Sequence, residues 1–256
     1  MTQANPVLPI MAHLVLGYPS LAESTRTAEQ YIAAGVQILE LQIPFSHPTA
    51  DGPVITKACQ QAVELGTTVQ DCIEAIRGLQ ARYPDQEIIV MSYLNRIYNY
   101  GFQKFVNVME AIGIKNLIIP DLPVETYPAF RTQDLTLKLV PVLAANTSDH
   151  RLATLLAADY NFYYLMSDFK ITGSGFSLHP RLREMIQKIR AQLSKTHIAP
   201  RIGIGFGISS PEQARTVARE ADLAIIGSAL IQAQNEGKLP EYLESLREIF
   251  HAPIPT

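Results

Sequence analysis

The fold is decided by the run VQILELQI at residues 36–43, which follows the helical pattern LAESTRTAEQYIAA at residues 21–34. The run is mostly apolar and rich in Ile, Leu and Val, which is typical of a parallel strand covered by helices on one side and packed side chains on the other. A strand that directly follows an amphipathic helix indicates one unit of an alternating α/β fold.

The same alternation continues in both directions along the chain. The runs expected to be strands are Ile10–Leu16, Val36–Ile43, Glu87–Ser92, Asn116–Pro120, Lys138–Leu143, Phe162–Met166, Arg201–Gly205 and Leu223–Gly227. The helical patterns are Leu21–Ala34, Val69–Tyr83, Gln103–Ile112, Asp149–Ala158, Leu182–Leu193, Pro211–Arg219 and Pro240–Phe250. Eight strands alternating with helices in this length favour a closed (β/α)8 TIM barrel over an open doubly wound sheet.

The composition is that of a globular protein. Hydrophobic residues make up 47% and charged residues 18% of the 256 residues, and no linker or charge block divides them, so we expect a single barrel domain over residues 1–256. A formal net charge of −3 gives no global field for binding nucleic acid or an anionic membrane. No apolar run approaches the roughly 18–20 residues needed to span a bilayer.

The cysteines and the N-terminal segment predict a cytoplasmic protein. Cys59 and Cys72 lie 13 positions apart, which fits neither a zinc ligand pair nor a disulfide framework, so we expect inert thiols and no metal site. The apolar stretch Val7–Leu16 has no preceding Lys or Arg and contains Pro9 and His13. We therefore expect it to be a first strand rather than a signal sequence.

Glu40 is a carboxylate inside an apolar strand. By the alternation of side chains, Ile38, Glu40 and Gln42 share one face, which should point into the barrel. Burial disfavours the charged form of a carboxyl group and so suits it to proton transfer, which makes Glu40 a candidate acid–base residue. The open alternatives are a Glu satisfied by neighbouring donors and a strand of the opposite phase.

Asp51 lies in a loop whose backbone is restricted by Pro48 and Pro53, next to the permissive Gly52. Such a loop could hold a carboxylate over the mouth of a barrel, where catalytic residues gather. The alternative is an ordinary Asp-Gly turn.

Taken together, residues 39–53, LELQIPFSHPTADGP, resemble the signature of the tryptophan synthase alpha chain family, commonly Glu-Leu-Gly-x-Pro-Phe-Ser-Asp-Pro-x-Ala-Asp-Gly-Pro. Further segments resemble the family in the same order over most of the chain: LGYP at 16–19, DLPVE at 121–125, ITG at 171–173 and GFGISSPEQ at 205–213. The resemblance implies a lyase of tryptophan biosynthesis that cleaves indole-3-glycerol phosphate to indole and glyceraldehyde 3-phosphate by a retro-aldol reaction.

The resemblance also implies which residues act. Glu40 would protonate indole C3 and assist removal of the hydroxyl proton, and Asp51 would stabilise positive charge at the indole N–H. The implied substrate-binding residues are Tyr93, Tyr164, Thr172, Gly173, Phe206, Gly207, Ile225, Gly227 and Ser228. The residue types alone leave alternatives open. The glycines are equally suited to tight packing, Ser228 could cap a helix, and the tyrosines could be part of the core.

The family resemblance implies a partner as well, the tryptophan synthase beta chain in an α2β2 heterotetramer. The chain itself would need no cofactor, because pyridoxal phosphate would belong to the beta chain. Two alternatives stay open: a catalytically weak alpha chain that mainly activates the beta chain, and a phosphate-binding barrel with another lyase or isomerase activity.

The chain departs from the family beside the candidate site. His47 stands where the family usually has an acidic residue, and Gln42 stands where it often has Gly. A histidine there removes a firm negative charge from contacts with a partner. The segment SDFKITGSG at residues 167–175, with Asp168 and Lys170, lacks the usual Arg before Thr-Gly, which could alter closure of this loop over substrate.

Overall fold

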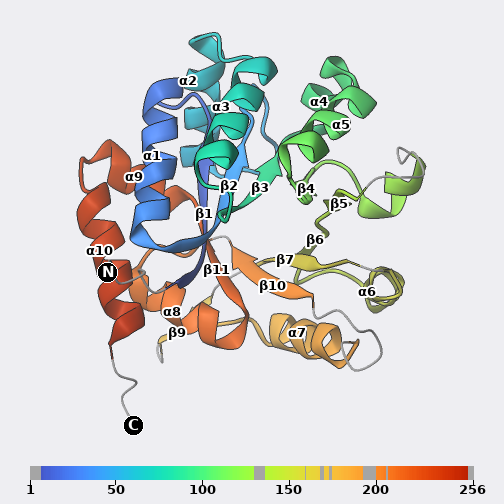
Figure 1. The fold of residues 1–256 in the computed structure, drawn as a ribbon. Helices are drawn as coiled ribbons and strands as arrows, with labels where there is room; N and C mark the ends of the chain where they lie inside the picture. Colours follow the sequence, from blue (N-terminus) through green and yellow to red (C-terminus); the bar gives the residue numbers. More distant parts are fainter. Residues whose placement is uncertain are drawn as a thin grey trace.

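The fold is a ring of parallel strands surrounded by helices (Figure 1). The computed structural model describes residues 7–129, 136–158, 160–167, 170–172, 175–192, 200–205 and 207–252. Within these ranges, the ring contains β1 (Leu8–Val15), β2 (Val36–Gln42), β3 (Glu87–Met91), β4 (Asn116–Ile118), β5 (Lys138–Leu139), β6 (Val142–Ala144), β7 (Phe162–Met166), β10 (Arg201–Gly205) and β11 (Leu223–Ile226). Their order is β5-β4-β3-β2-β1-β11-β10-β7-β6.

One interrupted segment closes the ring. β5 pairs with β4 and β6 pairs with β7, and both lie in the predicted fifth strand, Lys138–Leu143, which continues to Ala144. Pro141 has no N–H to donate, which explains the interruption. The Val140 N–H donates to the Leu117 carbonyl at 2.9 Å, and the Tyr164 N–H donates to the Pro141 carbonyl at 3.0 Å. The segment is thus bonded along both edges, and the predicted (β/α)8 barrel is confirmed.

The helices cover the outside of this ring (Figure 1). They are α1 (Leu21–Ala34), α2 (Pro53–Glu64), α3 (Val69–Arg82), α4 (Leu94–Tyr100), α5 (Phe102–Ile112), the 3-10 helix η1 (Val124–Ala129), α6 (Asp149–Leu156), α7 (Pro180–Gln192), α8 (Pro211–Glu220), α9 (Ser228–Asn235) and α10 (Leu239–His251). No helix among the described residues is both long and apolar enough to cross a membrane.

Several elements were absent from the sequence prediction. They are the helices α2, α4 and α9 and the 3-10 helix η1. Helices α4 and α9 begin within three residues of the end of a strand, whereas α2 and η1 begin inside the longer segments that follow β2 and β4. The residues after β7 also form an antiparallel pair, β8 (Lys170–Thr172) and β9 (Gly175–Ser177), where only a loop was expected. The seven predicted helices are all present, and the predicted start at Ser210 and Pro211 is confirmed because Ser210 accepts from the Gln213 N–H.

The interior of the ring contains the predicted face of β2. Ile38 packs in an inner cluster with residues such as Met11, Phe162 and Ile225, whereas Leu39 and Leu41 belong to the core between sheet and helices. Since side chains alternate along a strand, Glu40 lies on the inner face with Ile38.

Gly203→Ala is expected to lower the free energy of unfolding by about 1–3 kcal/mol through overpacking. A Cβ at position 203 would lie 2.8 Å from both Ile225 Cδ1 and Phe162 Cζ inside the ring. Gly78→Ala is the matched control, because a Cβ there meets nothing within 4 Å, and in helix α3 it should raise stability by about 0.5–1 kcal/mol. Urea unfolding followed by circular dichroism measures the free energy of unfolding of both variants. If Gly203→Ala were as stable as the wild type, the packing described here would be contradicted.

Candidate active site

A cavity of about 790 Å³ opens where the C-terminal ends of the strands meet. Its size is that of a site for a small molecule. Glu40 and Asp51 both line it, as do Tyr164, Ile225, Gly207, Gly227 and Ser228. Seven of the predicted site residues therefore surround one space.

Glu40 faces a histidine across the strand pair. His13 of β1 is the register partner of Glu40 in β2, so both side chains leave the sheet on the same side. Their exposed fractions are 4% and 3%, and His13 Nδ1 lies 3.4 Å from Glu40 Oε1. Desolvation, the largest contribution, lowers the pKa of His13, but the charges of Glu40 and Asp51 with hydrogen bonding to Glu40 and Gln42 raise it overall.

Asp51 is held by two donors, one from β2 and one from the residues between β3 and α4. The Tyr93 hydroxyl donates to Asp51 Oδ2 at 2.9 Å, and the Gln42 amide donates to the same oxygen at 2.7 Å. The Ala50 N–H donates to the Tyr93 hydroxyl at 3.0 Å and so fixes the loop as well. Burial raises the pKa of Asp51, although the charge of His13 and these two hydrogen bonds counteract part of that effect.

Asp51 also takes part in a turn, since its N–H donates to the Pro48 carbonyl at 3.0 Å. The turn named as an alternative for Asp51 is therefore present, and the same residue also lines the cavity. The turn brings the carboxylate to the cavity, and helix α2 then begins at Pro53.

The glycine-rich loops after β10 and β11 form another part of the cavity wall. Gly207 has φ 78°, which favours glycine, and it lines the cavity with Ser209. Gly227 precedes helix α9 and provides no side-chain cap to the first turn of that helix. Uncapped backbone N–H groups at a helix start are suitable donors for an anion.

The aromatic candidates fall into two groups. The ring of Tyr164 lines the cavity, and a Cβ at position 205 would meet its hydroxyl at 2.4 Å, so Gly205 leaves the space for it. Tyr93 is buried behind the cavity wall, where its ring stacks on Phe45 at 5.2 Å between centroids. Tyr93 thus contacts Asp51 rather than the cavity.

Five positions named in the sequence analysis are not described in full. Gly173 and Phe206, like Asp168, lie outside the described residues. Thr172 and Lys170 are described only as backbone positions of β8. Among the described residues, no group of three His, Cys, Asp or Glu is placed to hold a metal ion.

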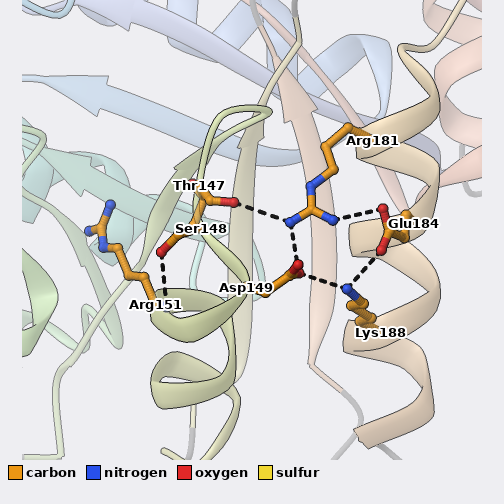
Figure 2. A network of polar contacts seen from close by, with 7 residues as sticks. All are labelled: Thr147, Ser148, Asp149, Arg151, Arg181, Glu184 and Lys188. Carbon is orange, nitrogen blue, oxygen red and sulfur yellow. Dashed lines mark hydrogen bonds and ion pairs between the residues drawn. The ribbon is translucent and has the colours of Figure 1, made fainter.

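A polar network anchors the loop after β6 to helix α7 (Figure 2). The Arg181 guanidinium donates to the Thr147 carbonyl at 3.3 Å and to Asp149 at 2.8 Å. Hydrogen bonds from Lys188 and Arg181 lower the pKa of Asp149 to about 2. Because Thr147 lines the cavity, this network fixes one side of its mouth.

Sequence reasoning missed His13 as a site residue and noted Gln42 only as a departure from the family. The available signal was that His13, like Glu40, is a polar residue two positions before the end of an apolar strand. A polar side chain at that height of a barrel strand indicates the site.

Comparison with known proteins identifies the family. The family model described as "Tryptophan synthase alpha chain" matches residues 4–249. The tryptophan synthase alpha chain of Desulfotalea psychrophila is 33% identical over 229 residues, covering 89% of this chain and 88% of that protein. That of Thermosynechococcus vestitus is 34% identical over 254 residues, covering 95% and 92%.

Solved structures agree with this result. A structure of Mycobacterium tuberculosis tryptophan synthase has 27% sequence identity and a TM-score of 0.79, and the match covers 98% of this chain and 95% of that one. The conserved architecture and the sequence matches extend over nearly the whole chain, so the chain belongs to the tryptophan synthase alpha chain family.

Proposed function

We propose that this chain cleaves indole-3-glycerol phosphate to indole and glyceraldehyde 3-phosphate, as a carbon–carbon lyase of tryptophan biosynthesis. This cleavage is the alpha reaction of the family to which the chain belongs. The observation that carries the proposal is that Glu40 and Asp51 line the same cavity as Gly227 and Ser228. One molecule with an indole ring and a phosphate could contact all four.

Glu40 acts as the acid–base residue in this proposal. Its carboxylate takes the proton of the glycerol hydroxyl next to the ring, and that carbon becomes the aldehyde carbon of glyceraldehyde 3-phosphate. Glu40 then gives that proton to C3, which places positive charge on the ring nitrogen. The C–C bond breaks as the hydroxyl carbon becomes a carbonyl carbon, and the electron pair of the bond restores the indole ring. The position of Glu40, buried on the inner face of β2, supports this role.

Asp51 stabilises the positive charge that develops at the indole N–H. The bonds from Tyr93 and Gln42 both reach Oδ2, so within the described part of the chain Oδ1 is the oxygen left for the ligand. Tyr164 and Ile225 supply the wall against the indole ring, while Gly207, Gly227 and Ser228 bind the phosphate. By resemblance to the family, we assign Thr172, Gly173 and Phe206 to substrate binding as well.

We further propose that the chain works with a tryptophan synthase beta chain in an α2β2 complex and needs no cofactor of its own. Pyridoxal phosphate would belong to that partner. The solved structures similar to this chain include complete tryptophan synthases, which supports the partnership. The buried thiols of Cys59 and Cys72 support a reducing cytoplasm, and the pairing of β1 with β11 supports one domain over residues 1–256.

Indole release from indole-3-glycerol phosphate, measured with and without beta chain, tests the proposed function. A lyase releases indole, and more of it with beta chain present. Activation of the beta chain without any indole release would instead show a regulatory alpha chain. Absence of both would favour another reaction in this barrel.

Ser228→Ala is expected to raise the KM for indole-3-glycerol phosphate about tenfold with little change in kcat. The hydroxyl lies at the start of α9 beside the cavity, and a hydrogen bond to a charged group contributes about 1.5–3 kcal/mol. Steady-state kinetics measure the change. Ser245→Ala, at an exposed position of α10, is the control and should leave KM unchanged; equal KM values for the two variants would argue against a phosphate contact.

A further inference from the structure

We propose that His13 is a positioning residue for Glu40: as an imidazolium it supplies the counter-charge of the Glu40 side chain and fixes the orientation of Oε1. This proposal rests on the acid–base role proposed for Glu40 and adds a second residue to it. No other described residue forms an ion pair with Glu40.

The backbone brings the two side chains together. His13 and Glu40 are register partners in adjacent parallel strands, and the two following pairs, Leu14 with Leu41 and Val15 with Gln42, keep the same register. The ring of His13 lies against Gly227, where a Cβ would be 3.4 Å from its Cβ and Cδ2 atoms. The imidazole is thus confined between a carboxylate and a glycine of the cavity wall.

The surroundings of His13 favour a cation. Glu40 from β2 and Asp51 from the following loop are two carboxyl groups that act on His13, and Gln42 forms a hydrogen bond with it. The Tyr164 hydroxyl from β7 interacts with the same two carboxyl groups. Two carboxylates close together repel each other, and an imidazolium next to them reduces that cost. The raised pKa of His13 agrees with this arrangement.

A histidine that served only to fill the core would have both ring nitrogens satisfied by the protein. Here Nδ1 faces Glu40, and Nε2 has no hydrogen-bond partner among the described residues although it is buried. His13 also lines the cavity. The ring is therefore placed to act on the site rather than only to pack.

The proton balance of the reaction is unchanged by this role. Glu40 accepts the hydroxyl proton and returns it to indole C3 within one turnover, while His13 keeps its own proton throughout. As pH rises through the pKa of His13, the imidazolium is lost and Glu40 loses its counter-charge. Turnover should then decline on the alkaline side of the pH profile.

The first test follows the titration of histidine side chains by ¹⁵N NMR in the full-length protein, with the His13 signal assigned by its loss in His13→Gln. In Glu40→Gln the titration midpoint of His13 should move to lower pH, because the attracting charge is gone. His47 is exposed and outside this pair, so its midpoint is the internal control. A His13 midpoint that does not move overturns the proposal.

The second test measures kcat and KM for indole release against pH with beta chain present. His13→Phe keeps the ring shape but has no N–H, and we expect kcat near neutral pH to fall at least tenfold, the alkaline decline to disappear and KM to change little. His13→Gln restores a neutral donor and should recover part of kcat without the alkaline decline. A His13→Phe profile that superimposes on the wild-type profile overturns the proposal.

These tests separate the two proposals. Indole release by Glu40→Gln at the wild-type rate would remove the acid–base role of Glu40 and the positioning role of His13 together. The NMR titration does not depend on catalysis. If Glu40→Gln loses activity as expected but the titration midpoint of His13 does not move, only the role of His13 is removed.

Discussion

Glu40→Gln is expected to lower kcat for indole release about 10²–10⁴-fold, with beta chain present, while KM changes little. The substitution keeps the shape of the side chain but removes the group that accepts and returns the proton, and general acid–base catalysis contributes factors of this size. Initial rates of indole release at saturating indole-3-glycerol phosphate measure the effect.

The variant also removes the ion pair of Glu40 with His13 inside the barrel. Circular dichroism and urea unfolding therefore accompany the kinetics, so that loss of fold is distinguished from loss of chemistry. Glu64→Gln, at the exposed end of helix α2, is the matched control and should keep full activity. A folded Glu40→Gln protein with a kcat within about threefold of wild type would contradict the proposed role, since that difference is well below a catalytic contribution.

Asp51→Asn is expected to lower kcat about 10²–10³-fold, which is the effect of removing one group that stabilises charge in a transition state. The amide has the same shape as the carboxylate but carries no negative charge for the indole N–H. The bond from Gln42 must also rearrange, because its amide donates to the oxygen that is replaced or turned away. Indole release in the presence of beta chain is again the measurement.

Tyr93→Phe is the matched control for Asp51→Asn, because it removes one hydrogen bond to Asp51 and leaves the negative charge. Its effect should be about tenfold, the lower end of the value of a hydrogen bond to a charged group, because Gln42 still donates to the same oxygen. Equal losses in Tyr93→Phe and Asp51→Asn would mean that Asp51 mainly holds the loop after β2 in place.

The barrel itself could be predicted from the sequence because strand and helix patterns are local. Phe162–Met166 and Arg201–Gly205 were predicted with the bounds of β7 and β10, since each is a short apolar run between helical patterns. Helix α2 was missed because Pro53 follows a turn sequence, although proline is well suited to the first position of a helix. The break at Pro141 divided one predicted strand into two.

The inner position of Glu40 could also be predicted, because the two-residue period of a strand assigns every second side chain to the same face. The contacts that complete the site could not. Tyr93 reaches Asp51 across 42 positions of sequence, and His13 meets Glu40 only through the register of two strands. Register is set by the assembled sheet, which a pattern within one strand does not specify.

The position of β1 between β2 and β11 has a consequence for folding during synthesis of the chain on the ribosome. Ribosomes add about 5–20 residues per second, so β11 leaves the ribosome roughly 10–40 s after β1. During this interval one edge of β1, with its backbone N–H and carbonyl groups, has no neighbouring strand. The nascent chain is therefore open to aggregation and to chaperones until its last strand is made, and His13 can meet Gly227 only after that.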